Sequence, residues 1–267
     1  MSPDPDTRPA RSPAPIAWVD GRVVPATEAT VPLLDDGFLR GDAVFETMLV
    51  RHGRTHARDA HLARMRDSAR ALGLRLPLLK RPIEDLLAAW GATEGALKVI
   101  VTRTGTVRGL LMAPDRPSSV SLHVVDIPWR TAISGTKTLS YAANQWAERQ
   151  AREQHADQAL ITTDGTVMEL PTAAIGWITA GRVHTPDPAA LPILDSVTVR
   201  AITAVTEVAY GSYPLDDLLG ADEVFVASAT RPVLPVHAVG HTEFPADGAA
   251  TRDLQAALAA HIEATLD

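Results

Sequence analysis

The chain has 267 residues, of which 46% are hydrophobic, and a formal net charge of -7. This length allows a substantial core, and we expect two lobes. The charge is modest and the basic residues do not cluster with aromatic ones, so the composition excludes a typical nucleic-acid-binding protein. No apolar run is long enough to predict a membrane span, and the absence of cysteine excludes disulfides, thiolate nucleophiles and zinc-cysteine sites. The expected partners are therefore small molecules, with no nucleic acid and no membrane.

The N-terminal part of the chain predicts a short tail followed by the first lobe. Residues 1–14 are rich in proline and charge and lack an apolar segment, so we expect a disordered tail, no signal peptide and a cytoplasmic location. An N-terminal α/β domain is expected over residues 15–127. Its predicted elements are a hairpin around Asp20-Gly21, a buried strand that ends residues 38–50, a helix capped by Asp59, a helix over residues 82–90, and strands over residues 97–102 and 119–125.

Three arginines of this lobe are candidates for binding an anion. Arg64 lies off the core-facing stripe of the helix that Asp59 caps, where an arginine is either solvated or turned toward an anion. The stripe consists of Leu62, Met65, Ala69 and Leu72. Arg103 and Arg108 lie on a loop of small and flexible residues, which is either a surface hairpin or a loop that grips a carboxylate. The residues alone leave these alternatives open.

An interdomain linker is expected over residues 128–136, and a C-terminal domain over residues 137–267. The predicted elements of that domain are a helix over residues 143–155, hairpins around Asp164-Gly165 and Gly181, a helix over residues 197–209 capped by Asp195 or Ser196, strands over residues 223–226 and 233–239, and a closing helix with Leu254, Leu258, Ile262 and Leu266. Strands dominate both lobes without regular βαβ alternation. We therefore expect an α/β fold of the α+β type, with mostly antiparallel sheets flanked by helices.

Few motifs of known chemistry are present. The pairs His52/His56 and His237/His241 each fall around a glycine turn, so no metal site is predicted. The chain lacks the nucleophile-elbow, P-loop and dinucleotide-binding motifs. Lys137 stands alone in a segment of small, hydroxylated and apolar residues ahead of a predicted helix. By itself it is either a surface charge or a reactive amine.

Six blocks in order resemble the class IV, or fold-type IV, pyridoxal-phosphate enzymes. This family contains D-amino-acid transaminases, branched-chain transaminases, (R)-amine transaminases and aminodeoxychorismate lyases. Each block is weak alone, but their order and spacing cover nearly all of the chain after residue 15. The blocks are residues 39–47, residues 60–65, residues 137–141 with Asn144, residues 167–169, residues 193–198 and residues 223–230.

The resemblance implies a cofactor, a dimer and roles for individual residues. Pyridoxal 5'-phosphate would lie between the two lobes, in a homodimer that completes each active site. Lys137 would form a Schiff base with it and carry protons, because a desolvated lysine shifts toward its neutral, nucleophilic form. Glu169 would pair with the pyridine nitrogen. The other cofactor contacts would come from Arg64, Val197, Thr198, Ser228 and Ala229 at the phosphate and from Tyr141 near the ring oxygen.

Some positions depart from the family pattern. Phe45 stands where some D-amino-acid transaminases have a tyrosine that contacts the substrate carboxylate. Arg108-Gly109 resembles the start of the lyases' RGY loop, but Leu110 replaces its tyrosine. Phe45, Arg103 and Arg108 are the substrate-binding candidates. After Glu169, the apolar side chains of Leu170, Ala173 and Ala174 leave hydrogen bonding near the cofactor to backbone groups.

Three hypotheses follow from the resemblance. The first is a transaminase that moves an amino group between an amino acid, expected to be of the D configuration, or an (R)-amine and a 2-oxo acid. The second is an aminodeoxychorismate lyase, which forms 4-aminobenzoate and pyruvate with the same lysine and cofactor. The third is a non-catalytic protein that binds pyridoxal phosphate, motivated by the altered run after Glu169.

Overall fold

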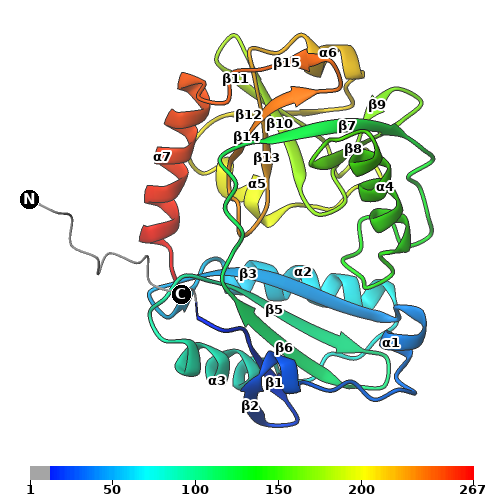
Figure 1. Cartoon of the computed structure of the whole chain (residues 1–267), viewed down its shortest axis with the longest axis vertical. Coiled ribbons are helices and arrows are strands. Elements are labelled where there is room, and N and C mark those ends of the chain that lie inside the picture. Colours follow the sequence, from blue (N-terminus) through cyan, green and yellow to red (C-terminus); the bar gives the residue numbers. More distant parts are fainter. Residues whose placement is uncertain (1–12) are drawn as a thin grey trace, which may run out of the picture.

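The computed structural model describes residues 13–267, so most of the predicted tail over residues 1–14 lies outside the described residues. The described chain forms two sheets, one from its N-terminal part and one from its C-terminal part (Figure 1). The sheets are mostly antiparallel and flanked by helices, which confirms the predicted fold class. Within residues 13–267, no helix combines the length and the apolar character that a bilayer span requires.

The first sheet has six strands in the order β2-β1-β6-β5-β3-β4, and all of its pairings are antiparallel. The predicted turn between its first two strands is present, because Asp20 and Gly21 both have positive φ angles, of 49° and 87°. The strands are β1 (Ile16–Val19), β2 (Arg22–Pro25), β3 (Ala43–Arg51), β4 (Arg54–Thr55), β5 (Gly95–Thr102) and β6 (Val107–Met112).

The helices of this part are η1 (Ala26–Glu28), α1 (Asp36–Arg40), α2 (Arg58–Ala71) and α3 (Lys80–Trp90). Met65 of α2, Leu86 of α3 and Val99 of β5 belong to one buried apolar cluster. Asp59 does not cap α2 as predicted, since the helix begins one residue earlier and Asp59 lies in its first turn. The carboxylate of Asp267 accepts the backbone N–H of Arg58 at 2.9 Å instead.

The second sheet has nine strands in the order β12-β11-β10-β13-β14-β7-β8-β9, with β15 paired to β14. Three of its pairings, β11 with β12 and β7 with both β8 and β14, are parallel. Its strands are β7 (Val120–Asp126), β8 (Gln158–Thr163), β9 (Thr166–Val167), β10 (Ala174–Thr179), β11 (Arg182–Pro186), β12 (Val208–Gly211), β13 (Glu223–Ala227), β14 (Leu234–Val239) and β15 (Thr242–Glu243).

The helices of the second part are α4 (Ala142–Glu153), α5 (Val197–Ile202), α6 (Leu215–Leu219) and α7 (Ala249–Ala264). Ser196 caps α5 as predicted, by accepting the N–H of Val199. The predicted extent of this helix to residue 209 is wrong, because Val208 and Ala209 pair in parallel with β11 as part of β12. Leu266 lies beyond the end of α7 but is buried, as expected of the last apolar position.

The chain changes sheets earlier than the predicted domain boundary. β7 pairs with β8 and β14, although the predicted domain over residues 15–127 assigned this strand to the first lobe. Alternating apolar residues predict a strand but not its partners, which explains the difference. By sheet membership, we propose that the first domain ends with β6 and that residues 113–119 connect the two domains, in place of the linker over residues 128–136.

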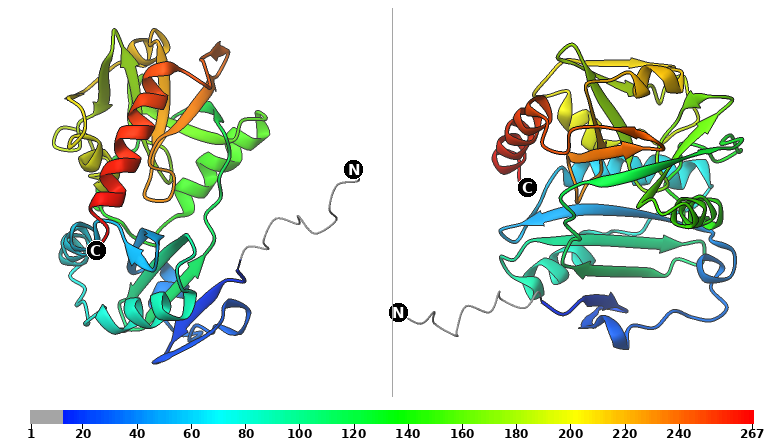
Figure 2. Two further views of the ribbon diagram at one scale, coloured as in Figure 1. Left: turned by 90° about the vertical axis from the view of Figure 1, so that its left-hand side faces the viewer. Right: turned by 45° about the horizontal axis from the view of Figure 1, so that its top comes forward.

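The segment around Lys137 returns from the second part to the first sheet. It pairs with β3, through a bridge between Val44 and Thr138 and a hydrogen bond of 3.0 Å from the N–H of Leu139 to the carbonyl of Ala43. Within the first part of the chain, helix α2 and strand β3 lie next to the second part (Figures 1 and 2). The segment is therefore held where the two parts meet.

Gly41 should be essential to this contact. It has a φ of +71°, and a Cβ at this position would lie 3.0 Å from the carbonyl oxygen of Leu139 and the Cα of Ser140. Gly73 is the matched control, because it has a φ of +60° but a Cβ there would meet no atom within 4 Å. We expect Gly73→Ala to lower the free energy of unfolding by about 1 kcal/mol and Gly41→Ala by about 2–4 kcal/mol in urea titrations. Equal losses in the two variants would contradict the role given to the contact.

Candidate active site

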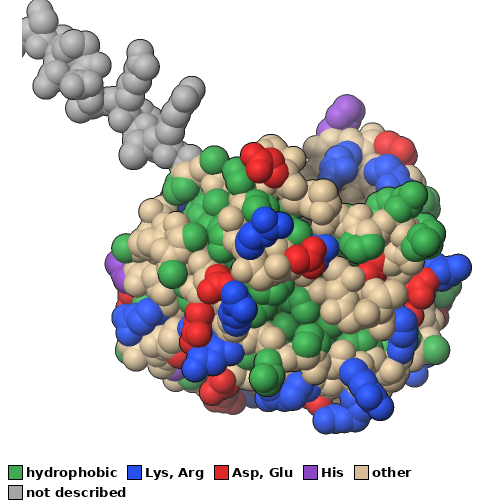
Figure 3. Space-filling model, turned by 90° about the horizontal axis from the view of Figure 1, so that it is seen from below, with side chains coloured by type: hydrophobic (Ala, Val, Ile, Leu, Met, Phe, Trp, Pro, Cys, Tyr) green, Lys and Arg blue, Asp and Glu red, His purple; other side chains and the backbone are tan. Residues whose placement is uncertain are grey.

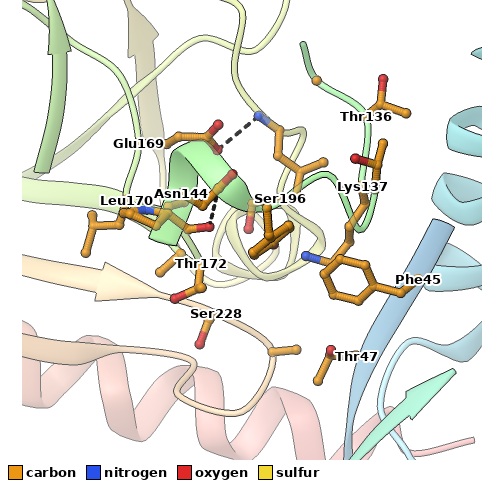
Figure 4. A pocket seen from close by; sticks show the side chains of 18 of the residues that line it. Phe45, Thr47, Thr136, Lys137, Asn144, Glu169, Leu170, Thr172, Ser196 and Ser228 are labelled. Atoms are coloured by element: carbon orange, nitrogen blue, oxygen red, sulfur yellow. Dashed lines mark hydrogen bonds between the residues drawn. The ribbon is translucent and has the colours of Figure 1, made fainter. Parts of the chain in front are cut away.

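One cavity of about 580 Å³ lies where the two parts of the chain meet. One wall comes from α2, β3, β5 and β6, and the other from the segment around Lys137, the loop after β9, the start of α5 and the turn between β13 and β14. Its volume is within the range of small-molecule sites. Figure 4 shows Lys137 and Phe45 on one side of the space, with Glu169, Thr172 and Ser228 around it.

The backbone of Lys137 is fixed by two neighbours. Its N–H donates to Ser68 Oγ at 3.1 Å, and its carbonyl accepts from the N–H of Phe45 at 3.2 Å. The side-chain amine enters the cavity, and its Nζ lies 4.7 Å from the centroid of the Phe45 ring. Burial, followed by the charge of Arg64, lowers the pKa of Lys137 to about 8. Lys137 is therefore far more often neutral near pH 8 than an ordinary lysine.

Glu169 lies in the loop after β9 and faces the same cavity. Its Oε1 accepts the Nε1–H of Trp129 at 2.9 Å, and its Oε2 accepts the N–H of Leu194 at 3.1 Å. Burial raises the pKa of Glu169, and these two hydrogen bonds oppose the rise. The carboxylate is thus held in one orientation and is poised to share a proton with a basic ligand atom.

Arg64 is anchored by a carboxylate that the sequence reasoning did not single out. Its Nε and Nη2 donate to the two oxygens of Glu46 at 2.7 and 2.8 Å, and its Nη1 donates to the carbonyl of Asp195 at 2.8 Å. Glu46 is fully buried, and His61 Nδ1 lies 2.7 Å from its Oε2. Burial alone would raise the pKa of Glu46, but the hydrogen bonds from His61 and Arg64 outweigh it and hold that pKa at about 2. In the sequence, the sign that Glu46 has a special role was its position as a charged residue within the mostly apolar strand β3.

Most of the other predicted cofactor contacts also reach the cavity. Thr198, Ser228 and Ala229 line it, whereas the side chain of Val197 is buried beside it. Within residues 13–267, no acceptor is present for the backbone N–H groups of Val197 and Thr198. Such groups can bind an anion.

Tyr141 lines the cavity and packs edge-on against Phe45, with the ring centroids 5.5 Å apart. Burial raises the pKa of Tyr141 to about 12, so its phenol stays protonated at neutral pH. It can therefore donate a hydrogen bond to a ligand oxygen.

Two predicted substrate-binding residues do not reach the cavity of their own chain. Arg103 pairs with Asp42 and donates to the carbonyls of Leu72 and Gly73. Arg108 pairs with Asp20 and donates to the carbonyl of Thr30. Because local carboxylates and carbonyls occupy both guanidinium groups, the single chain does not support the prediction that they grip a substrate in this cavity. Phe45, the third candidate, does line it.

In the segment after Glu169, backbone groups make the hydrogen bonds, as the sequence suggests. Leu170 is buried, and its N–H donates to the carbonyl of Ala173 at 2.9 Å. The side-chain amide of Asn144 donates to the carbonyl of Pro171 at 2.8 Å. The loop that carries Glu169 is therefore held in place without polar side chains of its own.

Thr47, Lys98 and Arg231 also line the cavity and were not singled out from the sequence.

The lowered pKa of Lys137 can be measured on the protein without added ligands. Amines react with acetic anhydride only when neutral, so the acetylation rate of Lys137 should rise steeply through pH 8 and level off above it. Peptide mass spectrometry over a pH series measures this rate, with the exposed Lys80 as the internal comparison. A rate for Lys137 that keeps rising up to pH 10.5, the ordinary lysine value, would show that burial does not shift it.

Comparisons with known proteins agree with this arrangement. The family model described as amino-transferase class IV matches residues 43–239. A bifunctional aminodeoxychorismate lyase / D-amino acid transaminase from Mycobacterium tuberculosis is 30% identical, over 86% of this chain and 93% of that protein. A D-alanine aminotransferase from Bacillus licheniformis is 27% identical, over 90% and 94%. The structure of a hypothetical aminotransferase from Mycobacterium tuberculosis in a PLP-bound form superposes with a TM-score of 0.82 at 26% identity, covering 94% of this chain and 99% of that one. The chain belongs to the class IV aminotransferases, a fold-type IV family whose enzymes use pyridoxal phosphate.

Proposed function

We propose that this protein is a pyridoxal-phosphate-dependent transaminase that moves an amino group between an amino acid, in the first place of the D configuration, or an (R)-amine and a 2-oxo acid. One observation carries the proposal: the amine of Lys137, the carboxylate of Glu169 and the guanidinium of Arg64 face a single cavity. These are the three groups that the aldehyde, the ring nitrogen and the phosphate of the cofactor require.

The residues of the cavity fit the cofactor. Arg64 has five N–H donors, and three of them bind Glu46 and Asp195, which leaves two for a phosphate. Thr198 and Ser228 add hydroxyl groups that can bind the phosphate, and the backbone N–H groups at the start of α5 can bind it as well. Glu169 is the one carboxylate that lines the cavity within residues 13–267, so it is the partner available to the ring nitrogen.

The chemistry can be divided between the cofactor and the chain. When bound, pyridoxal phosphate supplies an aldehyde carbon that takes up the amino group and a ring that withdraws electrons. Lys137, neutral for much of the time near pH 8, attaches the cofactor and moves the proton at the substrate α-carbon. Trp129 and Leu194 hold Glu169 in place, and Tyr141 donates toward a ring oxygen.

A second candidate is an aminodeoxychorismate lyase, favoured by the relative from Mycobacterium tuberculosis whose name combines both activities. Lyase and transaminase would use the same lysine. They differ in outcome, because a transaminase moves the amino group onto the cofactor, whereas the lyase releases pyruvate and 4-aminobenzoate. Since the core of the site is common to both, the choice depends on the substrate wall of the cavity.

The reaction can be identified from the absorbance of the bound cofactor. We expect D-amino acids to change the spectrum of the loaded protein fully in the absence of a 2-oxo acid, and a 2-oxo acid to restore it. L-amino acids, (R)-amines and aminodeoxychorismate are tested separately, and Lys137→Ala should show no such change. If aminodeoxychorismate alone reacts and pyruvate appears, the lyase is the correct function. If no donor changes the spectrum, the protein is a non-catalytic binder.

We also propose that the protein is a homodimer. Several large apolar side chains between η1 and the end of α1 are exposed, including Leu34 at 84% and Phe38 at 59%. In Figure 1 this segment runs along the lower side toward α1, and hydrophobic side chains gather among charged ones on that face (Figure 3). Exposed clusters of this kind often mark interfaces. A second copy of the chain is the partner that the family resemblance suggests.

Single charges placed on this surface test the dimer. Leu34→Glu should convert the dimer to a monomer in light scattering after size-exclusion chromatography, because an interface buries the carboxylate at a cost. Leu78, 93% exposed in the connection between α2 and α3, provides the control, and Leu78→Glu should leave the dimer intact. A monomeric wild-type protein, or a dimer that survives Leu34→Glu, would contradict this interface.

A further inference from the structure

The start of helix α2, which carries Arg64, is not stabilised by its own sequence. The residue before the helix is Ala57, which has no side-chain acceptor for the N–H groups of the first turn. It also has a φ of 53°, a conformation that is unfavourable for any residue with a Cβ. Among the described residues of α2, buried side chains begin only at His61. The first turn therefore needs an acceptor from elsewhere in the chain.

Asp267, which follows α7 in the second part of the chain, supplies this acceptor. Its Oδ2 accepts the backbone N–H of Arg58 at 2.9 Å, and its Oδ1 accepts the hydroxyl of Thr55 at 2.8 Å. The backbones of Asp267 and Thr55 also pair in both directions, at 2.8 and 2.9 Å. The chain after α7 thus lies beside the first part, next to the start of α2 (Figure 1).

The position of Asp267 is fixed by the residue before it. Leu266 is buried, in one apolar cluster with Leu258 and Ile262 of α7 and with Leu49 of β3. Asp267 therefore cannot move independently of the second part. Its carboxylate joins the first turn of α2 to that part through a charge-assisted hydrogen bond, which is stronger than a neutral one.

The proposed phosphate site needs this connection because its groups come from both parts. Arg64 belongs to α2, and the N–H groups at the start of α5 belong to the second part. Arg64 lies about 9 Å along the helix from Arg58, at the rise of 1.5 Å per residue. His61, which lies between them, contacts the same carboxylate of Glu46 that holds Arg64. A disordered first turn would loosen His61 and, with it, the arginine.

We propose that Asp267 is a positioning residue for the cofactor phosphate, because its side chain caps α2 from the second part and so holds Arg64 opposite the start of α5. This inference rests on the proposed function, in which Arg64 binds that phosphate. Asp267 itself does not touch the cavity, as expected of a residue that acts through another.

The test compares two ligands that differ in the phosphate. Pyridoxal 5'-phosphate and pyridoxal share the ring and the aldehyde, so the ratio of their affinities for the unloaded protein isolates the phosphate contacts. Absorbance titrations should show that Asp267→Ala lowers this ratio by about 3- to 30-fold, the equivalent of a lost helix cap. Asp267→Asn should retain most of the ratio, because its amide oxygen can accept the N–H of Arg58.

Asp222 provides a matched control. Its Oδ2 accepts the N–H of Ala180 at 2.7 Å, and Ala180 has a φ of 50°, close to that of Ala57. This contact lies in the turn between β10 and β11, and Asp222 is not among the described residues that line the cavity. Asp222→Ala should leave the ratio unchanged. If Asp267→Ala weakens both ligands equally, its role is only structural and the proposal is wrong.

A second measurement does not depend on the cofactor. In hydrogen exchange of the unloaded protein, followed by mass spectrometry, Asp267→Ala should speed the exchange of residues 58–64 at least 3-fold, to the extent of the lost cap. Residues 80–90 of α3 should not change, and Asp222→Ala should change neither segment. Unchanged exchange in residues 58–64 would overturn the proposal. If the wild type binds neither ligand, the proposed function fails, and the exchange still decides whether Asp267 orders the helix that carries Arg64.

Discussion

The backbone pairing between β3 and the segment around Lys137 is the constraint on which the site depends. The hydrogen bonds from Phe45 to Lys137 and from Leu139 to Ala43 bring a residue of the second part of the chain onto a strand of the first sheet. Successive side chains of a strand point to opposite faces. Phe45 and Thr47 thus line the cavity, whereas Glu46 turns toward α2 and binds Arg64. One strand thereby positions both the amine and the anion-binding arginine.

Burial gives the charged groups of the cavity their chemical character. The same desolvation that lowers the pKa of Lys137 raises that of Glu169, so both groups shift toward their neutral forms. Glu46 behaves differently, because two hydrogen-bonded partners keep it ionised although it is fully buried. Its charge fixes Arg64 without occupying all of its donors. The cavity therefore combines a reactive amine with a cation that remains available to a phosphate.

The sequence was sufficient for those parts of the site that short local patterns encode. Lys137, Glu169 and Arg64 lie in blocks whose order resembles one family, and all three line the cavity. For Glu46 the sequence offers a charge inside an apolar strand but not its partners, and the place of Lys98 on the cavity wall depends on which strands pair and in which register. The contacts of Arg103 within its own chain were hidden for a related reason. Its partner Asp42 is distant in sequence, and only the folded chain brings the two together.

The same limit applies to the fold. Turn residues and apolar periodicity identified the hairpins and most helices, but not the parallel pairing of β7 or the return of β12 beside β11. Parallel pairings join segments that are far apart in the chain, so local patterns do not encode them. The apolar positions at Val208 and Ala209 continue a helical spacing from α5, yet they belong to a strand because β11 supplies their hydrogen-bond partners.

The central claim, that Lys137 is the amine that holds the cofactor, can be tested by chemical trapping. The protein is loaded with pyridoxal phosphate, reduced with borohydride, digested and mapped by mass spectrometry. The account predicts one modified lysine, Lys137, because burial lowers the pKa of its amine to about 8 and leaves a substantial neutral fraction near that pH. Modification of Lys98 in its place, or a protein that releases all of its cofactor after reduction, would contradict the account.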